Sequence, residues 1–168
     1  MHEFYRYFIN TQWFSGKFYI HFFTYWILNN VTLLTAFYAI GVKTSAKKSL
    51  SIALVVTVFF MILREYVLPP YSMVIIHFFA GLLIVFFYKI TLLRGFLGVF
   101  FSMVLLSMGT AFATYNLVML NYARVNQLLN TPVFLCLGYL EYIFNYIYII
   151  LAKKYQNLTL KSIFEDEV

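Results

Sequence analysis

Residues 71 to 93 read YSMVIIHFFAGLLIVFFYKITLL, an apolar run in which Lys89 is the one charged side chain. A helix rises about 1.5 Å per residue, so roughly 20 apolar residues cross the ~30 Å hydrocarbon core of a bilayer. Such a helix bonds every backbone polar group internally, which a non-helical chain in lipid cannot do. This run therefore predicts a membrane-spanning helix.

The composition of the whole chain also indicates a protein surrounded by membrane lipid. Of 168 residues, 63% are hydrophobic and 11% are charged, whereas soluble domains are roughly 45–50% apolar and about 25% charged. So few ionisable side chains cannot cover the surface of a compact soluble fold. The net charge of +6 comes from basic residues scattered between apolar runs, which argues against a nucleic-acid-binding face.

Four further apolar runs have spanning length, and short polar or proline-containing segments separate them. We expect one all-α domain, a polytopic membrane bundle of five transmembrane helices. The aromatic segment ahead of the first helix, with Trp13 and Phe14, is expected to lie at the membrane interface. The third and fourth runs could also form a re-entrant pair. The expected spans are residues 18–42, 49–68, 71–93, 95–122 and 132–152.

The positions of lysine and arginine predict the orientation. With the N-terminus outside, eight basic residues lie on the cytoplasmic side and four lie outside. The positive-inside rule then favours a cell-membrane protein with an outer N-terminus and a cytoplasmic C-terminus. The eight cytoplasmic residues are Lys43, Lys47, Lys48, Lys89, Arg94, Lys153, Lys154 and Lys161.

Glu141 lies near the middle of the last run. An ionised carboxylate at the bilayer centre costs about 2.5–3.5 kcal/mol on insertion scales, so it should face protein or trapped water, or be protonated. Helical spacing places Gly138, Glu141 and Asn145 on one face, which we expect to pack inward. Arg64 and His77, near the outer ends of the second and third spans, are candidate partners. A packing element, a ligand or ion site and a protonation switch all remain open for Glu141.

Two further groups of residues stand out within the spans. Asn29 and Asn30 are adjacent amides that both need partners in hydrocarbon, so at least one should line the bundle interior. Small residues recur on one face of the fourth span, and such a stripe lets another helix approach closely. Whether that helix belongs to this chain or to a second subunit is open. The stripe consists of Gly98, Ser102, Gly109 and Ala113.

Motifs of catalysis are missing from the sequence. There is no HExxH, no glycine-rich phosphate loop and no GxSxG, and the first aspartate is Asp166, which excludes intramembrane aspartyl chemistry. The single cysteine, Cys136, excludes an intramolecular disulfide and a multi-cysteine metal site. We expect no enzymatic activity, no cofactor and no metal.

The order of these features resembles the membrane sensor region of agr-type, GHKL-family sensor histidine kinases of Gram-positive bacteria. The resemblance is one of pattern over nearly the whole chain. It implies a bacterial signalling or regulatory membrane module that, lacking a phosphoacceptor histidine and an ATP-binding motif, acts through partner membrane proteins. Its segments are VKTSAKKSLSIAL (42–54), REYVLPPYSMVIIHFF (64–79), YKITLLRGFLGVFFSMVLLSMG (88–109) and LGYLEYIFNYIYIILAKK (137–154).

A small transport subunit, similar to the substrate-binding component of energy-coupling-factor transporters, is the alternative. It predicts an outward cavity walled by the first and fifth spans, gathering Trp26, Asn29 and Tyr139 above Glu141. A sensor-like module instead predicts a closed bundle with a partner-facing stripe on the fourth span. Expected partners are the lipid bilayer and a membrane protein or a second copy of the chain, with no nucleic acid.

Overall fold

The computed structural model describes residues 16–67, 69–119 and 138–155. Within these ranges the chain is helical apart from its connections and contains no strand, so the expected all-α fold is confirmed. The interfacial N-terminal segment and residues 132–137 of the expected last span lie outside the described residues. The helices are α2 (Gly16–Ala39), α3 (Ala46–Tyr66), α4 (Pro69–Tyr88), α5 (Leu92–Met119) and α8 (Ile143–Lys154).

Three of these helices, α3, α4 and α5, are long and apolar enough to cross a membrane. Only a third of the residues in the apolar stretch of each of these helices are buried within the bundle, and the outward faces carry residues such as Val58, Phe86 and Phe100. In α2 the adjacent Asn29 and Asn30 lower the mean hydropathy. The 12 residues of α8 form a helix of about 18 Å.

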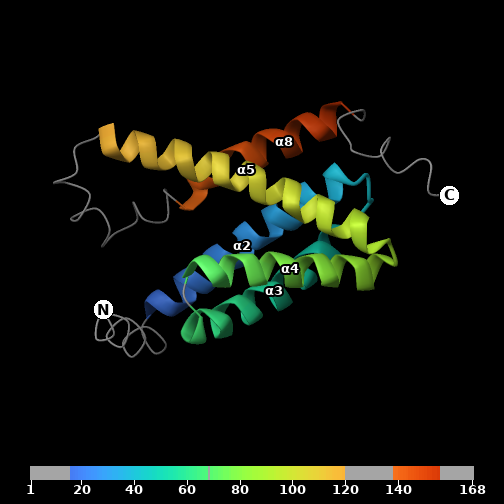
Figure 1. Cartoon of the computed structure of the whole chain (residues 1–168), viewed down its shortest axis with the longest axis horizontal. Coiled ribbons are helices and arrows are strands. Elements are labelled where there is room, and N and C mark those ends of the chain that lie inside the picture. The colour runs from blue at the N-terminus through green and yellow to red at the C-terminus, as the bar shows by residue number, and fades with distance from the viewer. Residues whose placement is uncertain (1–15, 68, 120–137, 156–168) are drawn as a thin grey trace.

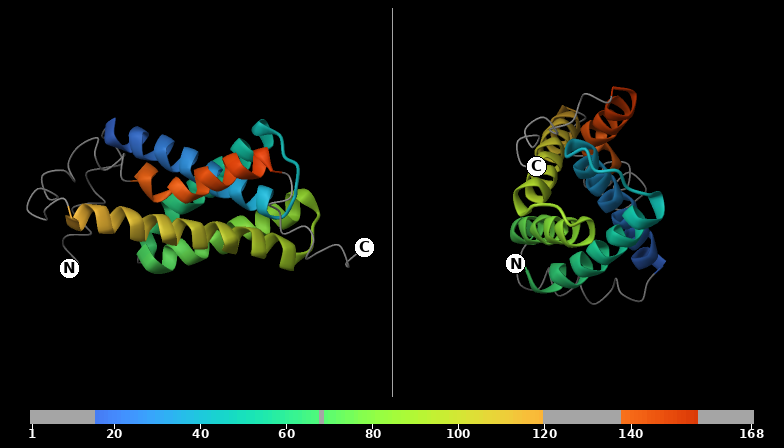
Figure 2. Two further views of the ribbon diagram at one scale, coloured as in Figure 1. Left: turned by 90° about the horizontal axis from the view of Figure 1, so that it is seen from above. Right: turned by 90° about the vertical axis from the view of Figure 1, so that its right-hand side faces the viewer.

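Successive helices run in alternating directions, and α2 lies beside three of the other four (Figures 1 and 2). It packs against α3, α5 and α8, while α4 packs against α3 and α5. Apolar side chains form two clusters. The first includes Phe37 of α2 with residues of α3, α4 and α5, and the second joins Leu28 of α2 to Leu106 of α5 and Ile149 of α8. Because α2 contributes to both clusters, it is the shared core of the bundle.

The first helix ends three residues before the expected boundary at Val42. Gly41 adopts a left-handed conformation, with φ of 67°. Its amide donates to the Tyr38 carbonyl at 3.2 Å, and the Val42 amide donates to the Phe37 carbonyl at 2.9 Å. This pair of bonds is a Schellman motif, which terminates α2 and turns the chain toward α3. Apolar content continues past Gly41, so hydropathy placed the end too late.

The third helix likewise ends at Tyr88 and not at residue 93, because Lys89 has φ of 50° and reverses the chain. The 20 residues of α4 and 28 residues of α5 correspond to about 30 Å and 42 Å of helix. Each is therefore long enough for a full crossing and longer than a re-entrant hairpin requires.

The expected last span is interrupted. Residues 138–141 form a single helical turn, the chain turns at Tyr142 (φ −93°, ψ 8°), and α8 begins at Ile143. The Tyr142 amide donates to the carbonyl of Tyr139, three residues back, at 3.2 Å. Apolar and aromatic residues lie on both sides of this break, so hydropathy does not reveal that the helix is interrupted here.

Candidate functional site

The adjacent amides of α2 both bond to α3. Asn29 Nδ2 donates to Thr57 Oγ1 at 2.9 Å, and Ser49 Oγ donates to Asn30 Oδ1 at 2.6 Å. Ser49 and Thr57 are fully buried. An unpaired amide in hydrocarbon costs several kcal/mol, about 2–7 depending on the reference state, so these bonds join the two helices. Asn29 and Asn30 thus serve helix pairing at this interface.

The small-residue stripe of α5 faces helices of the same chain. A Cβ at Gly98 would lie 2.8 Å from Ile40 Cγ2 and 3.0 Å from the Ala36 carbonyl oxygen of α2. A Cβ at Gly109 would collide with the main-chain carbonyl of Glu141. These two glycines let the α5 backbone approach α2 near one end and the turn before α8 near the other. The stripe that a sensor-like module was expected to turn toward a partner is therefore internal.

The other two members of the stripe are buried in the same interface, with Ala113 2% and Ser102 0% exposed. Ser102 Oγ accepts a bond of 3.3 Å from Asn145 Nδ2 of α8. Asn145 is fully buried, and its Oδ1 has no hydrogen-bond partner among the described residues. A buried unsatisfied acceptor costs about 1–3 kcal/mol, so this amide is a less effective link than Asn29.

Glu141 is only half-buried. The break at Tyr142 disrupts the continuous helix that would have aligned Gly138, Glu141 and Asn145, and only Asn145 is fully buried. Within the described part of the chain, the Glu141 carboxylate makes no hydrogen bond or ion pair; its main-chain carbonyl is the group that packs on α5. The Arg64 side chain lies outside the described residues, and His77 bonds elsewhere.

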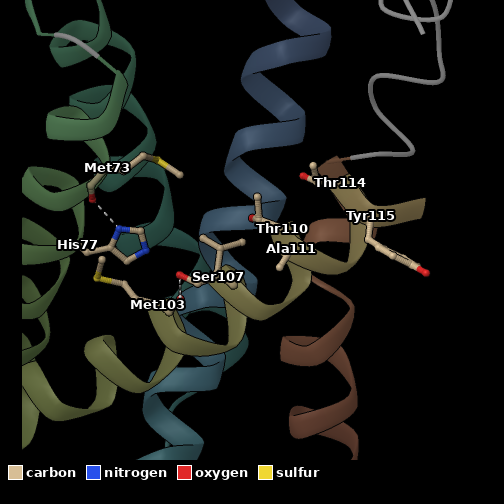
Figure 3. Close-up of a pocket in the computed structure, with 9 residues that line it drawn as sticks. Met73, His77, Met103, Ser107, Thr110, Ala111, Thr114 and Tyr115 are labelled. Atoms are coloured by element: carbon tan, nitrogen blue, oxygen red, sulfur yellow. Dashed lines mark hydrogen bonds between the residues drawn. The ribbon is translucent and has the colours of Figure 1, made fainter. Parts of the chain in front are cut away.

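A cavity of about 650 Å³ lies between α4 and α5 and opens on the flank of the bundle (Figure 3). We name it the flank groove. Met73 and His77 of α4 form one wall. The other wall is a row of residues from α5, chiefly Met103, Ser107, Thr110, Ala111 and Thr114.

His77 is the most deeply placed polar side chain of the flank groove, at 7% exposure. Its ring projects from α4 toward α5 (Figure 3), and its Nδ1 lies 2.7 Å from the Met73 carbonyl oxygen. A carbonyl can only accept, so Nδ1 carries the hydrogen in this bond, and in the neutral ring Nε2 is an acceptor. Among the described residues Nε2 has no hydrogen-bond partner, which leaves an acceptor turned into the groove.

The α5 wall presents small and hydroxyl-bearing side chains at helical spacing. Ser107, Thr110, Ala111 and Thr114 follow one another at intervals that place them on one face, and all four are exposed. Ser107 Oγ donates to the Met103 carbonyl at 2.9 Å. Small and hydroxyl residues on a membrane helix are typical of helix–helix interfaces. The spacing was readable in the sequence, but sequence analysis selected the glycine-containing stripe on another face of α5.

The flank groove is equipped for recognition. It combines apolar lining residues with one imidazole acceptor, from His77, and with the hydroxyl groups of Ser107, Thr110 and Thr114. Among the described residues, no three His, Cys, Asp or Glu side chains gather closely enough to hold a metal ion. No family model, curated protein or solved structure matches this chain.

Proposed function

We propose that the protein is a five-span bundle of a bacterial cell membrane that acts as a signalling or regulatory module through a partner membrane protein. The flank groove is the observation that carries this proposal. A transmembrane helix of the partner lies in the groove, against the exposed α5 row and beneath the His77 ring. No catalytic step is assigned to the protein.

The occupant is a helix because of what the groove contains and where it opens. The groove opens sideways from helices whose other outward faces are covered by exposed Val, Ile, Leu and Phe, so an occupant enters from the lipid. Helix interfaces in membranes are built from close packing on small residues and from interhelical hydrogen bonds. The surface for close packing is formed by Thr110, Ala111 and Thr114. His77 Nε2 accepts the interhelical hydrogen bond, from a hydroxyl or amide of the partner.

The five-crossing orientation, with the N-terminus outside, is supported by charge. Every Lys and Arg whose side chain is described lies near the end where α2 stops, α3 begins and α8 finishes, seven residues in all. A bundle with its cations at one end satisfies the positive-inside rule when that end is cytoplasmic. The first helix has 24 residues, enough for a tilted crossing.

Packing between α2 and α8 favours this function over a transport subunit. The transport alternative needs a cavity between these helices, but Leu28 and Val31 of α2 contact Tyr142 and Ile149 there in a buried apolar cluster. Asn29, a substrate-binding residue in that alternative, already bonds to Thr57.

The proposal is tested by blocking the flank groove. Thr110→Trp fills the groove with an indole, and Val58→Trp places the same side chain on the outward face of α3, where Val58 is 45% exposed. Wild type and both variants are extracted from their native membranes into nanodiscs, and the complexes are measured by native gel and mass spectrometry.

We expect wild type and Val58→Trp to carry the same second membrane polypeptide, and Thr110→Trp to lose it at least tenfold. Equal unfolding temperatures for the two variants exclude misfolding as the cause. Equal retention by both variants, a complex containing only a second copy of this chain, or no complex at all would overturn the proposal.

A further inference from the structure

Cations gather at the end of the bundle where the α2–α3 and α4–α5 connections lie (Figures 1 and 2), and hydrogen bonds join the residues beside these connections. Lys43 and Lys47 belong to the first connection and the start of α3, while Lys89 follows α4 directly. All three side chains are exposed.

Two further cations hold the connections together. Arg94 donates from Nε and Nη2 to the Ile40 carbonyl at the end of α2, at 3.2 and 2.7 Å. Lys48 Nζ donates to the Phe87 carbonyl at 3.0 Å and lies 3.9 Å from the centre of the Tyr88 ring. The hydroxyls of Thr44 and Tyr88 also bond across the two connections. Lys48 and Arg94 are thus committed to structure.

The exposed lysines are the chain neighbours of these contacts. Lys43 precedes Thr44, Lys47 precedes Lys48, and Lys89 follows Tyr88. Because Thr44 and Lys48 are bonded to Tyr88 and Phe87, the main chains of the three exposed lysines lie close together. Within the described part of the chain, none of the three ammonium groups makes a hydrogen bond or an ion pair. The one carboxylate with a described side chain, Glu141, precedes α8, and the 12 residues of α8, about 18 Å of helix, lead from it toward this end of the bundle.

We propose that this end of the bundle binds the phosphate-bearing headgroup of an anionic membrane lipid, held by Lys43, Lys47 and Lys89. The three lysines stand beside the ends of apolar helices, at the depth where lipid headgroups lie. Lysines near a membrane surface each strengthen attraction to anionic lipid about fivefold. This inference goes beyond the proposed function and is independent of what occupies the flank groove.

Phosphatidylglycerol is the probe. The protein is purified in a zwitterionic detergent, phosphatidylglycerol is titrated in, and binding is followed by native mass spectrometry. The test variant is Lys43→Gln/Lys89→Gln. Its matched control is Lys153→Gln/Lys154→Gln, which removes the same charge at the same end of the bundle, from α8. Unfolding temperatures without lipid establish that both variants are folded.

We expect Lys43→Gln/Lys89→Gln to weaken lipid binding about twenty-five-fold, as two lysines at about fivefold each imply, and the α8 variant to weaken it less than threefold. Inorganic phosphate at matched ionic strength should not displace the lipid. Equal losses in the two variants would reveal diffuse attraction and overturn the proposal, as would an unchanged affinity. Displacement by phosphate alone would identify a site for a soluble anion, and would overturn it as well.

Discussion

The close approach of α5 to the turn before α8 yields a stability prediction. Gly109 of α5 faces the main-chain carbonyl of Glu141, and a Cβ there would collide with backbone atoms that cannot rotate away. Gly138, in the neighbouring turn, is the matched control, because a Cβ there would meet Leu28 Cδ1 at an ordinary 3.7 Å. We therefore expect Gly109→Ala and Gly138→Ala, which add the same methyl group, to have opposite effects.

The magnitude follows from three contributions. Replacing glycine by alanine within a helix contributes about 1 kcal/mol of stability through propensity. At position 109 the collision forces α5 away from the turn before α8, at about 1–3 kcal/mol for overpacking. The same movement weakens the 3.3 Å bond between Asn145 and Ser102, worth about 1 kcal/mol. Gly109→Ala should lose about 2 kcal/mol, while Gly138→Ala should be neutral or gain up to about 1 kcal/mol.

Thermal unfolding in a single detergent measures the difference. At about 2–4 °C per kcal/mol for a chain of this size, the unfolding temperature of Gly109→Ala should lie about 4–12 °C below that of Gly138→Ala. Circular dichroism follows loss of helix, and tryptophan fluorescence follows loss of packing. If the two variants unfold at the same temperature, α5 does not approach the Glu141 backbone, and the account of the stripe as an internal packing surface fails.

Three further predictions use the same protein. Asn145→Leu should cost less than about 1 kcal/mol, because it removes an unsatisfied acceptor together with one long bond of 3.3 Å to Ser102. Asn29→Leu should cost about 1–2 kcal/mol, because it removes the 2.9 Å bond to Thr57 and leaves that hydroxyl only its own donation to the Ala53 carbonyl; the reverse order in thermal unfolding would refute this ranking. Arg94→Lys should destabilise by about 1–2 kcal/mol, since an ammonium cannot reproduce the paired donation to Ile40, and an unfolding temperature equal to that of wild type would contradict the capping role. In a Cys136→Ser background, Lys43→Cys should react with a membrane-impermeant maleimide only after cells are permeabilised, and labelling of intact cells would exclude the proposed orientation.

Sequence reasoning predicted the helices because lipid leaves few alternatives. A run such as residues 71–93 must bond its own backbone, so length and hydropathy predict a helix without knowledge of its neighbours. The ends of the helices were harder to predict from the sequence. Gly41 and Lys89 reverse the chain through left-handed backbone conformations, and hydropathy does not detect these because Val42 and Ile90, which follow them, are apolar.

The candidate site depended on information that spacing does not contain. The stripe of Gly98, Ser102, Gly109 and Ala113 was visible as a periodic pattern, but its neighbours, α2 and the turn before α8, come from distant parts of the chain. The flank groove requires the relative placement of α4 and α5, since His77 enters it from one helix and Thr110 from the other. The charge of Glu141 made its carboxylate the candidate in the sequence. In the structure its main-chain carbonyl, beside the break at Tyr142, is the group that packs against Gly109 of α5.

Site-specific photocrosslinking in native membranes shows directly whether a partner helix occupies the flank groove. A photoreactive phenylalanine analogue is placed in turn at Ser107, Thr110 and Thr114, and at Met108 and Phe112, which are exposed on the adjoining face of α5. If a partner helix lies in the groove, the first three positions yield one crosslinked membrane protein and the other two yield lipid adducts. Lipid adducts from all five positions, or the same protein product from both faces, would contradict it.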